Sequence, residues 1–235
     1  MIPIITKEQM TKIDELAVKH FGIEIMQMME IAGKNTAEMA RKMLKRVKGK
    51  EIVCLAGKGN NGGDALVAAK YLTNWGAKVT VINVNHPDEM NQLTKEQNGI
   101  LRSMHVSLLY TTNVMAFEKI FKTTDLIIDG LLGYSVNGNP RGFYGKVIEM
   151  ANHVNKKILS IDIPSGLDPN TGEAYEPCIK ASVTLCLTLP KKGCVENKKF
   201  AGDIYVADMG IPNEVYELMG LHVGPIFQEK DIIKL

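Results

Sequence analysis

The sequence has few of the features that mark metal-thiolate, nucleic-acid-binding or membrane proteins. Its four cysteines form no CxxC pair, which argues against a thiolate metal site or a redox motif. A net charge of only +2 offers no basic surface for nucleic acid. No apolar run approaches the roughly 18 residues of a membrane span, and residues 1–10 do not resemble a signal peptide. We therefore expect a cytoplasmic protein with no membrane or nucleic-acid partner.

Common catalytic signatures are also missing. The five histidines are scattered and form no HxxxH pair, which argues against zinc. The sequence contains no GxSxG elbow, and Ser165 follows a proline, so a Ser-His-Asp hydrolase has little support.

Short apolar runs alternate with helical stretches from residue 51 onward. This alternation is typical of βα units that pack helices on both faces of a mostly parallel sheet. We predict one domain over residues 1–235, with a helical extension (1–48) and a three-layer αβα, doubly wound, Rossmann-like core (49–235). The predicted strands are 51–56, 78–84, 106–110, 125–128, 157–161, 181–187 and 203–206, and the predicted core helices are 64–75, 89–104, 114–121 and 144–152.

The extension is predicted to hold two amphipathic helices. Thr6 and Gln9 fit a capping box, and apolar residues follow at helical spacing to about residue 20. Residues 25–47 form a second such pattern, whose stripe includes Met29 and Met39. We interpret these methionines as core filling, because flexible thioethers fill irregular gaps.

A glycine-rich segment, residues 57–64, joins the first predicted strand to the next helix. Gly57, Gly59 and Gly62 match GxGxxG, and such a turn can bind a phosphate or another anion at the helix N-terminus. The acidic residue of the ordinary NAD fingerprint is missing after the second strand, and no Lys-Ser/Thr pair completes a P-loop. Tight packing alone is a third interpretation, but it leaves two asparagines and Asp64 unexplained.

Two aspartates each follow a buried strand at the edge where open α/β sheets bind ligands. Asp129 and Asp162 end apolar runs, and a carboxylate so close to the core needs a cation, hydrogen-bond donors or a proton. Residues 130–142, 164–172 and 190–193 form further loops at this edge. Oxygen donors from Asn61, Asp129 and Ser165 suit a hard cation, and a single carboxylate favours a monovalent ion.

Several segments, taken together, carry a family resemblance. AGKGNNGGDALVAAKYL, DGLLGYSVNG, DIPSGLD, LPKKG and VADMGIP occur in this order, after MMEIAG at residues 28–33. They resemble the YjeF N-terminal family, the NAD(P)H-hydrate epimerases. The resemblance implies a Rossmann-like enzyme that interconverts the R and S forms of hydrated NADH or NADPH, which carry a hydroxyl at C6 of the nicotinamide ring.

The resemblance also implies roles for individual residues. Asp162 is our candidate for the catalytic acid/base, because it ends a buried strand. A potassium ion is implied at Asn61, Asp129 and Ser165. The chain departs from the family pattern at Ala65 and at the Tyr134–Ser135 pair. The implied substrate contacts are Asn60, Asn61, Gly62, Gly63, Asp64, Gly133, Tyr134, Ser135, Val136, Asn137, Gly138, Asn139 and Asp162.

Partners follow from the same resemblance. The family implies a dehydratase that acts on the S epimer, here expected as a separate protein, and we expect a homodimer. Lys191 is either a phosphate contact or an exposed, solvated lysine. Residues 222–235 are expected to form a terminal segment that packs against the domain.

The main alternative function is a non-catalytic scaffold of the same fold. An ordinary NAD-dependent oxidoreductase is disfavoured by the missing ribose acid.

Overall fold

The strands form one sheet in the order β3-β2-β1-β4-β5-β6-β7-β8. The computed structural model describes residues 2–110 and 117–235. All neighbouring strands are parallel except β8, which is antiparallel to β7. The strands are β1 (Glu51–Ala56), β2 (Lys78–Asn83), β3 (Ser107–Leu109), β4 (Leu126–Gly130), β5 (Ile158–Ile161), β6 (Val183–Leu187), β7 (Asp203–Ala207) and β8 (Ile232–Lys234).

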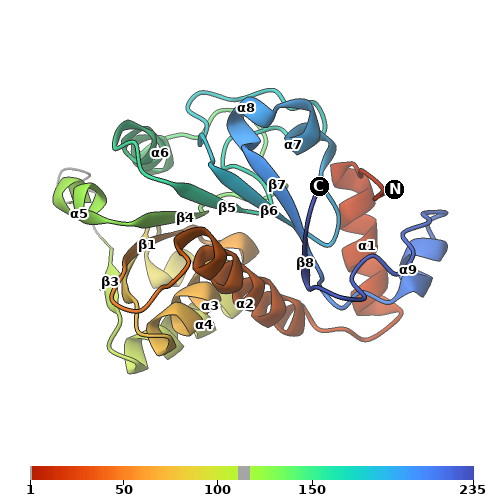
Figure 1. The fold of residues 1–235 in the computed structure, drawn as a ribbon, viewed down its shortest axis with the longest axis horizontal. Helices are drawn as coiled ribbons and strands as arrows, with labels where there is room; N and C mark the ends of the chain where they lie inside the picture. Colours follow the sequence, from red (N-terminus) through yellow and green to blue (C-terminus); the bar gives the residue numbers. More distant parts are fainter. Residues whose placement is uncertain (1, 111–116) are drawn as a thin grey trace.

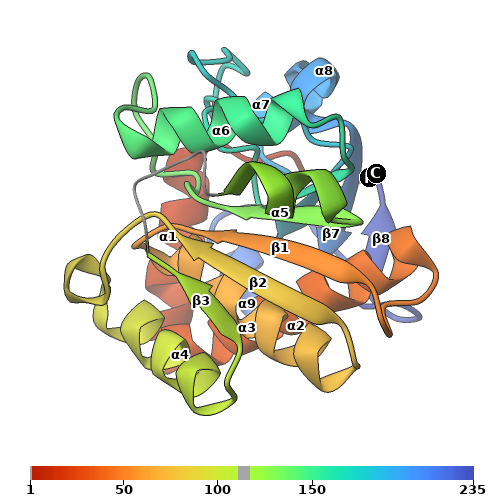
Figure 2. The same ribbon diagram turned by 90° about the vertical axis from the view of Figure 1, so that its left-hand side faces the viewer.

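Helices cover both faces of this sheet, which confirms the predicted αβα architecture. Figures 1 and 2 show α2, α3 and α4 on one face and α5 and α6 on the other. The helices are α1 (Lys7–Lys19), α2 (Ile25–Leu44), α3 (Asn60–Asn74), η1 (Pro87–Glu89, a 3-10 turn), α4 (Gln92–Ser103), α5 (Glu118–Thr123), α6 (Phe143–His153), α7 (Lys192–Glu196), α8 (Lys198–Ala201) and α9 (Asn213–Glu217).

The strand order places the switch point between β1 and β4. The chain runs outward from β1 to β2 and β3 and then crosses to β4 on the other side of β1. In open α/β sheets the ligand site lies at the carboxyl ends of the strands beside such a point. The loops that follow β1, β4, β5 and β6 all leave the sheet at this edge, because these strands are parallel.

Two apolar cores explain the layers. One joins the inner faces of α2, α3 and α4 to the sheet, with Met39, Leu66 and Leu101 fully or almost fully buried. The other lies under α5 and α6 and contains Phe121 and Val147. The strands are buried on both faces, so they read as continuous apolar runs, as is usual in parallel sheets.

The N-terminal extension is integral to the domain. The Thr6 capping box is present at the start of α1. The backbone of Ile5 bonds to the loop after β6, and α1 lies beside α9 at the β8 end of the sheet (Figure 1). A Cβ on Gly33 would overlap the Val67 side chain, so this glycine lets α2 approach α3 closely.

Several predicted boundaries were wrong, for local reasons. α3 begins at Asn60, four residues early, because Gly59 takes the N-cap position without a side-chain cap. The predicted helix 89–104 divides into η1 and α4, because the Asn91 side chain accepts a hydrogen bond from the Thr94 N–H and caps a new helix. Residues 114–116 of the predicted helix 114–121 lie outside the described residues, and α5 begins at Glu118.

The short elements after β6 were not predicted. They are α7, α8 and α9, together with β8, which adds the terminal segment to the sheet edge. Among residues 2–110 and 117–235, no helix is long and apolar enough to cross a membrane.

Candidate active site

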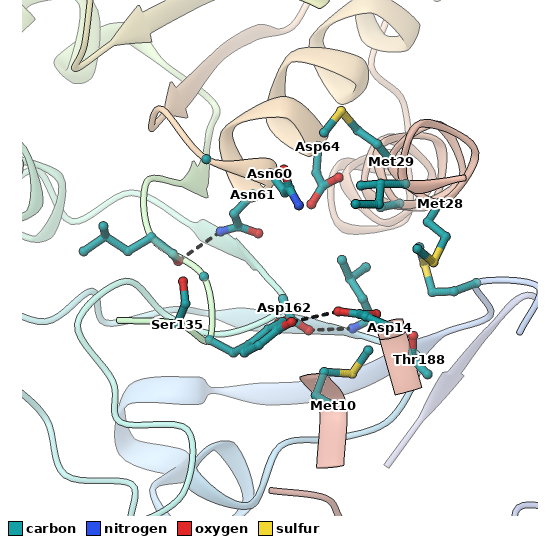
Figure 3. Close-up of a pocket in the computed structure, with 18 of the residues that line it drawn as sticks. Met10, Asp14, Met28, Met29, Asn60, Asn61, Asp64, Ser135, Asp162 and Thr188 are labelled. Atoms are coloured by element: carbon teal, nitrogen blue, oxygen red, sulfur yellow. Dashed lines mark hydrogen bonds between the residues drawn. The ribbon is translucent and has the colours of Figure 1, made fainter. Parts of the chain in front are cut away.

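A cavity of about 460 Å³ opens at the carboxyl ends of β1, β4, β5 and β6. Its walls come from both halves of the chain, including α1 and α2 of the extension (Figure 3). The residues that line it include Asp14, Asn60, Asn61, Asp64, Leu132, Tyr134, Asp162 and Lys191.

The implied substrate contacts divide into two groups. The predicted contacts that line the cavity are Asn60, Asn61, Asp64, Gly133, Tyr134, Ser135 and Asp162. Gly62 and Gly63 are buried in α3. Residues 136–139 are not among the cavity-lining residues; the Asn139 side chain instead accepts a hydrogen bond from the Glu176 N–H, 3.1 Å away. The substrate contacts remain predictions.

The glycines of the β1–α3 turn serve close packing. A Cβ on Gly57 would overlap the Leu131 carbonyl oxygen, and one on Gly62 would overlap the carbonyl of Gly57 itself. A Cβ on Gly63 would meet the Met29 thioether. Packing therefore accounts for Gly57, Gly62 and Gly63, whereas the polar residues Asn60, Asn61 and Asp64 line the cavity.

The start of α3 leaves backbone donors open to a ligand. The first helical bond runs from the Gly63 N–H to the Gly59 carbonyl, so the N–H groups of residues 60–62 precede the helical ladder. The Asn60 side chain is held by Asn91, whose Nδ2 donates to Oδ1 at 2.7 Å. Such a helix N-terminus favours an anion, and a phosphate bound at this turn remains a prediction.

Replacing Gly57 by alanine is expected to destabilise the fold by about 1–3 kcal/mol, because the methyl group would overlap a backbone oxygen that cannot move freely. The melting temperature should fall by about 2–4 °C per kcal/mol. Gly99→Ala in α4 is the matched control, since a Cβ there meets nothing within 4 Å and the residue caps no helix. Equal melting temperatures for the two variants would contradict this packing role.

Asp129 is a fully buried carboxylate at the end of β4. Its Oδ1 accepts from Ser165 Oγ at 2.6 Å and from the Leu131 N–H at 3.3 Å. Its Oδ2 accepts from Ser160 Oγ at 2.8 Å and from the Ser165 N–H at 2.9 Å. Burial raises the pKa of Asp129, and these hydrogen bonds oppose the shift only in part. Within the described part of the chain it forms no ion pair.

Leu132 links the three predicted cation ligands. Its carbonyl accepts a hydrogen bond from Asn61 Nδ2 at 3.0 Å, and its N–H donates to Ser165 Oγ at 2.9 Å. Ser165 in turn contacts Asp129. Over residues 2–110 and 117–235 no cluster of three His, Cys, Asp or Glu side chains could hold a metal. The donor set is therefore made of neutral oxygens and one buried, uncompensated carboxylate, which fits a hard monovalent cation.

Asp162 lies at the end of β5 and pairs with a buried lysine. Its carboxylate is in ion-pair contact with Lys191 Nζ and accepts from the Leu187 N–H at 3.1 Å. Lys191 is 0% exposed, and its ammonium also donates to the Leu187 carbonyl at 2.8 Å. Burial acts to lower the pKa of Lys191, but the Asp162 carboxylate outweighs it and the pKa is raised. The interpretation of Lys191 as an exposed lysine was wrong.

The backbone at Asp162 is unusual. Its φ of 66° lies in the left-handed region, which costs a non-glycine residue about 1–3 kcal/mol. The conformation is held by a bond from its N–H to the Leu185 carbonyl at 2.7 Å. This turn directs the carboxylate into the cavity, where its Oδ2 has no hydrogen bond to the described residues (Figure 3).

Two further carboxyl groups face the same space. Burial raises the pKa of Asp14, which accepts a hydrogen bond from Tyr134 Oη at 2.7 Å. Burial raises the pKa of Asp64 well above its usual value, and the carboxylates of Asp162 and Asp14 add to the shift. Asp14 was missed from the sequence, although its position four residues after Met10, on the apolar stripe of α1, was a readable signal.

The methionines serve two purposes. Met39 packs in the core, as expected, whereas Met10, Met28 and Met29 line the cavity. Their flexible thioethers supply the site with an adaptable apolar lining.

Comparison with known proteins gives one family and a consistent set of relatives. The family described as YjeF-related protein N-terminus matches residues 25–193. An NAD(P)H-hydrate epimerase of Cenarchaeum symbiosum is 40% identical over 80% of this chain and 86% of its own length. An enzyme of the same name from Dehalogenimonas lykanthroporepellens is 34% identical, over 92% and 86% of the two chains.

A longer relative and a solved structure are also similar to this chain. The bifunctional NAD(P)H-hydrate repair enzyme Nnr of Moorella thermoacetica is 32% identical over 90% of this chain, which spans only 41% of that enzyme. The crystal structure of yeast ynu0, YNL200c, superposes with a TM-score of 0.88, at 26% identity and over 100% of both chains.

Proposed function

The chain belongs to the YjeF-related N-terminal family, and from that membership we propose that it is an NAD(P)H-hydrate epimerase. It interconverts the R and S forms of hydrated NADH and NADPH at C6 of the nicotinamide ring. One observation carries the proposal beyond the names of its relatives: Asp162, buried and paired with Lys191, keeps one oxygen turned into a cavity at the ligand edge of the sheet.

The chemistry follows from the substrate. C6 of the hydrated ring bears both a hydroxyl and the ring nitrogen, so the nitrogen lone pair can expel the hydroxyl and leave an iminium ion. Water then returns to the opposite face. The departure needs a proton donor and the return needs a proton acceptor. Asp162 is proposed to exchange protons with the C6 oxygen, held in place by Leu187 and Lys191.

Substrate binding is assigned to the loops around the cavity. The N–H groups at the start of α3, with the side chains of Asn60 and Asn61, would hold the negatively charged part of the dinucleotide. Tyr134 and the loop after β4 would lie along the ring. A dehydratase that acts on the S epimer completes the repair, and a homodimer remains part of this proposal.

A potassium ion is proposed at Asn61, Asp129 and Ser165. The buried Asp129 carboxylate, which has no ion pair with the described residues, and the oxygen donors around Leu132 support it. When bound, the ion supplies positive charge that offsets Asp129 and the substrate phosphates. Ser165 and Asn61 meanwhile hold the loop after β4 in place through Leu132.

Potassium is therefore expected to stabilise the protein as well as to activate it. At a concentration 100 times its Kd, a cation that binds only the folded state adds about 2.7 kcal/mol. The measurement is the melting temperature in potassium chloride against tetramethylammonium chloride at equal ionic strength. Asp129→Asn should abolish the difference. Identical melting of the wild-type protein in both salts would exclude the ion.

The function itself is tested with a hydrated NADH preparation. A dehydratase specific for the S form leaves the R form behind, and adding this protein should let the dehydratase consume the whole preparation. If the amount of R form left over equals that in the protein-free control, the result would favour the alternative, a non-catalytic scaffold of the same fold.

A further inference from the structure

Asp64 is a buried carboxyl group that has no partner among the described residues. It lies in the second turn of α3, is 7% exposed, and lines the cavity. Its carboxyl oxygens make no hydrogen bond or ion pair with the described residues, and no such contact contributes to its pKa. A carboxyl group in this position is costly when charged, so the surroundings favour its protonated form.

Asp162 has the opposite environment. The Lys191 ammonium and the Leu187 N–H both contact its carboxylate. Asp64 and Asp162 therefore differ in their polar contacts, and this difference suits one to donate a proton and the other to accept one. A carboxyl held neutral can donate a proton, and a carboxylate held charged can accept one.

Their placement fits a reaction that works on two faces of one carbon. Asp64 projects from α3 on one side of the cavity, and Asp162 reaches it from the end of β5 on the other (Figure 3). Epimerisation through an iminium ion requires the hydroxyl to leave one face of C6 and water to enter at the other. A single side chain does not serve both faces without moving.

We propose that Asp64 is a second catalytic residue, the acid that faces Asp162 across the nicotinamide ring. The inference rests on the proposed epimerase function. In one direction the Asp64 proton passes to the C6 hydroxyl, the C6–O bond breaks, the hydroxyl leaves as water, and the nitrogen lone pair forms the C=N bond. Water then adds to the other face, its proton passes to Asp162, and the C=N electron pair returns to nitrogen.

The step balances without any reactant other than water. It leaves Asp64 ionised and Asp162 protonated, which is the starting state for the reverse conversion by microscopic reversibility. A proton relayed through water from Asp162 to Asp64 restores the first state. Catalysis in both directions is what an epimerase needs.

Asp14 is the other carboxyl that could donate, and the contacts favour Asp64. The Tyr134 hydroxyl donates to Asp14, so one of its oxygens is occupied, and this donor supports the charged form. Asp64 has no such donor among the described residues. The ionisable groups that line the cavity besides Asp64 are Asp14 on α1, Lys58 before α3, Tyr134 after β4, Tyr144 on α6, Asp162 after β5 and Lys191 after β6.

The test compares Asp64→Asn with Asp14→Asn and wild type, in a direct assay of R-form conversion. We expect Asp64→Asn to lower kcat by about 10²–10⁴-fold, the usual range for a lost general acid, with KM changed only a few-fold. Glu30→Gln is the control, because Glu30 on α2 accepts hydrogen bonds from Lys70 and Tyr71 on α3 and does not line the cavity.

The pH profile separates an acid from a merely structural group. Wild-type kcat should fall at alkaline pH as Asp64 loses its proton, and Asp64→Asn should lack this fall. Asp14→Asn should keep it. If Asp64→Asn does not fold, Asp64→Ala replaces it, since alanine is a strong helix former.

The outcomes are distinct. A wild-type protein that does not epimerise contradicts the proposed function itself. A wild type that epimerises beside an Asp64→Asn variant with near-normal kcat overturns the role of Asp64 and leaves the function standing. Loss of the alkaline fall in Asp14→Asn rather than in Asp64→Asn would assign the acid to Asp14 instead.

Discussion

Asp162→Asn is expected to lower epimerisation by about 10²–10⁴-fold, through kcat rather than KM. Asparagine keeps an oxygen that can accept from the Leu187 N–H and from Lys191, so the geometry at the end of β5 is largely retained. It removes the carboxylate that exchanges a proton with the C6 oxygen. The measurement is the initial rate of R-form conversion across a range of substrate concentrations.

The control for this variant must account for Lys191, whose buried ammonium loses its counter-charge. Melting temperature and binding of the hydrated cofactor are therefore measured on the same preparation. Asp203→Asn breaks a remote, exposed ion pair with Lys234 and should behave as wild type. A folded, binding-competent Asp162→Asn with near-normal turnover would remove Asp162 from the mechanism.

Lys191→Met is expected to be the most destabilising single change, at about 3–5 kcal/mol. The lysine is 0% exposed and the Asp162 side chain is almost as deeply buried, so methionine leaves a largely buried carboxylate without its cation. Methionine is close to lysine in length, which limits the contribution of lost packing. Chemical denaturation reports the free energy of unfolding directly.

The double variant Lys191→Met/Asp162→Asn provides the matched test. If the cost comes from the uncompensated carboxylate, the double variant should recover most of the stability that Lys191→Met loses. If packing around the lysine stem matters instead, the double variant will be no more stable than Lys191→Met. That result would contradict the ion pair as the reason for burying Lys191.

The sign of the pH dependence follows from the raised pKa of Lys191. A cation whose folded pKa lies above its unfolded value stabilises the fold fully below the unfolded value, roughly 10.4 for lysine. That stabilisation is lost as the pH rises through the folded value. The stability difference between wild type and Lys191→Met should therefore be constant from neutral pH to about pH 9 and shrink only above about pH 10.

The sheet was the most predictable part of the molecule. Its strands are buried on both faces, so apolar runs locate β1 to within a residue and β4 to within two. The polar residues that end these runs lie at one edge because the strands are parallel. For the same reason the sequence alone predicts that Asp129 and Ser165 lie close together, and their side chains are indeed in contact.

Long-range contacts account for what the sequence did not reveal. The burial of Lys191 depends on β5 and on the N-terminal segment at Ile5, which are remote along the chain. Asp14 reaches the cavity only because α1 packs beside the loop after β4, where Tyr134 meets it. β8 was missed because it only joins the edge of a sheet built by earlier strands.

The helix start at Asn60 shows how one boundary changes the interpretation of a site. With the start at Asp64, residues 60–63 belong to a tight turn before the helix that could bind a phosphate. With the start at Asn60, they form the rigid first turn of α3, held by Asn91 and by the packing of Gly62 and Gly63. Asp64 then lies within the helix and lines the cavity, where it has no hydrogen-bond or ion-pair partner among the described residues.

The most direct test of the account uses the isolated R form of hydrated NADH and the purified protein in potassium-containing buffer. We predict that the R form approaches its equilibrium with the S form at a rate proportional to protein concentration and well above the uncatalysed rate. A rate equal to the uncatalysed one at every protein concentration would contradict it.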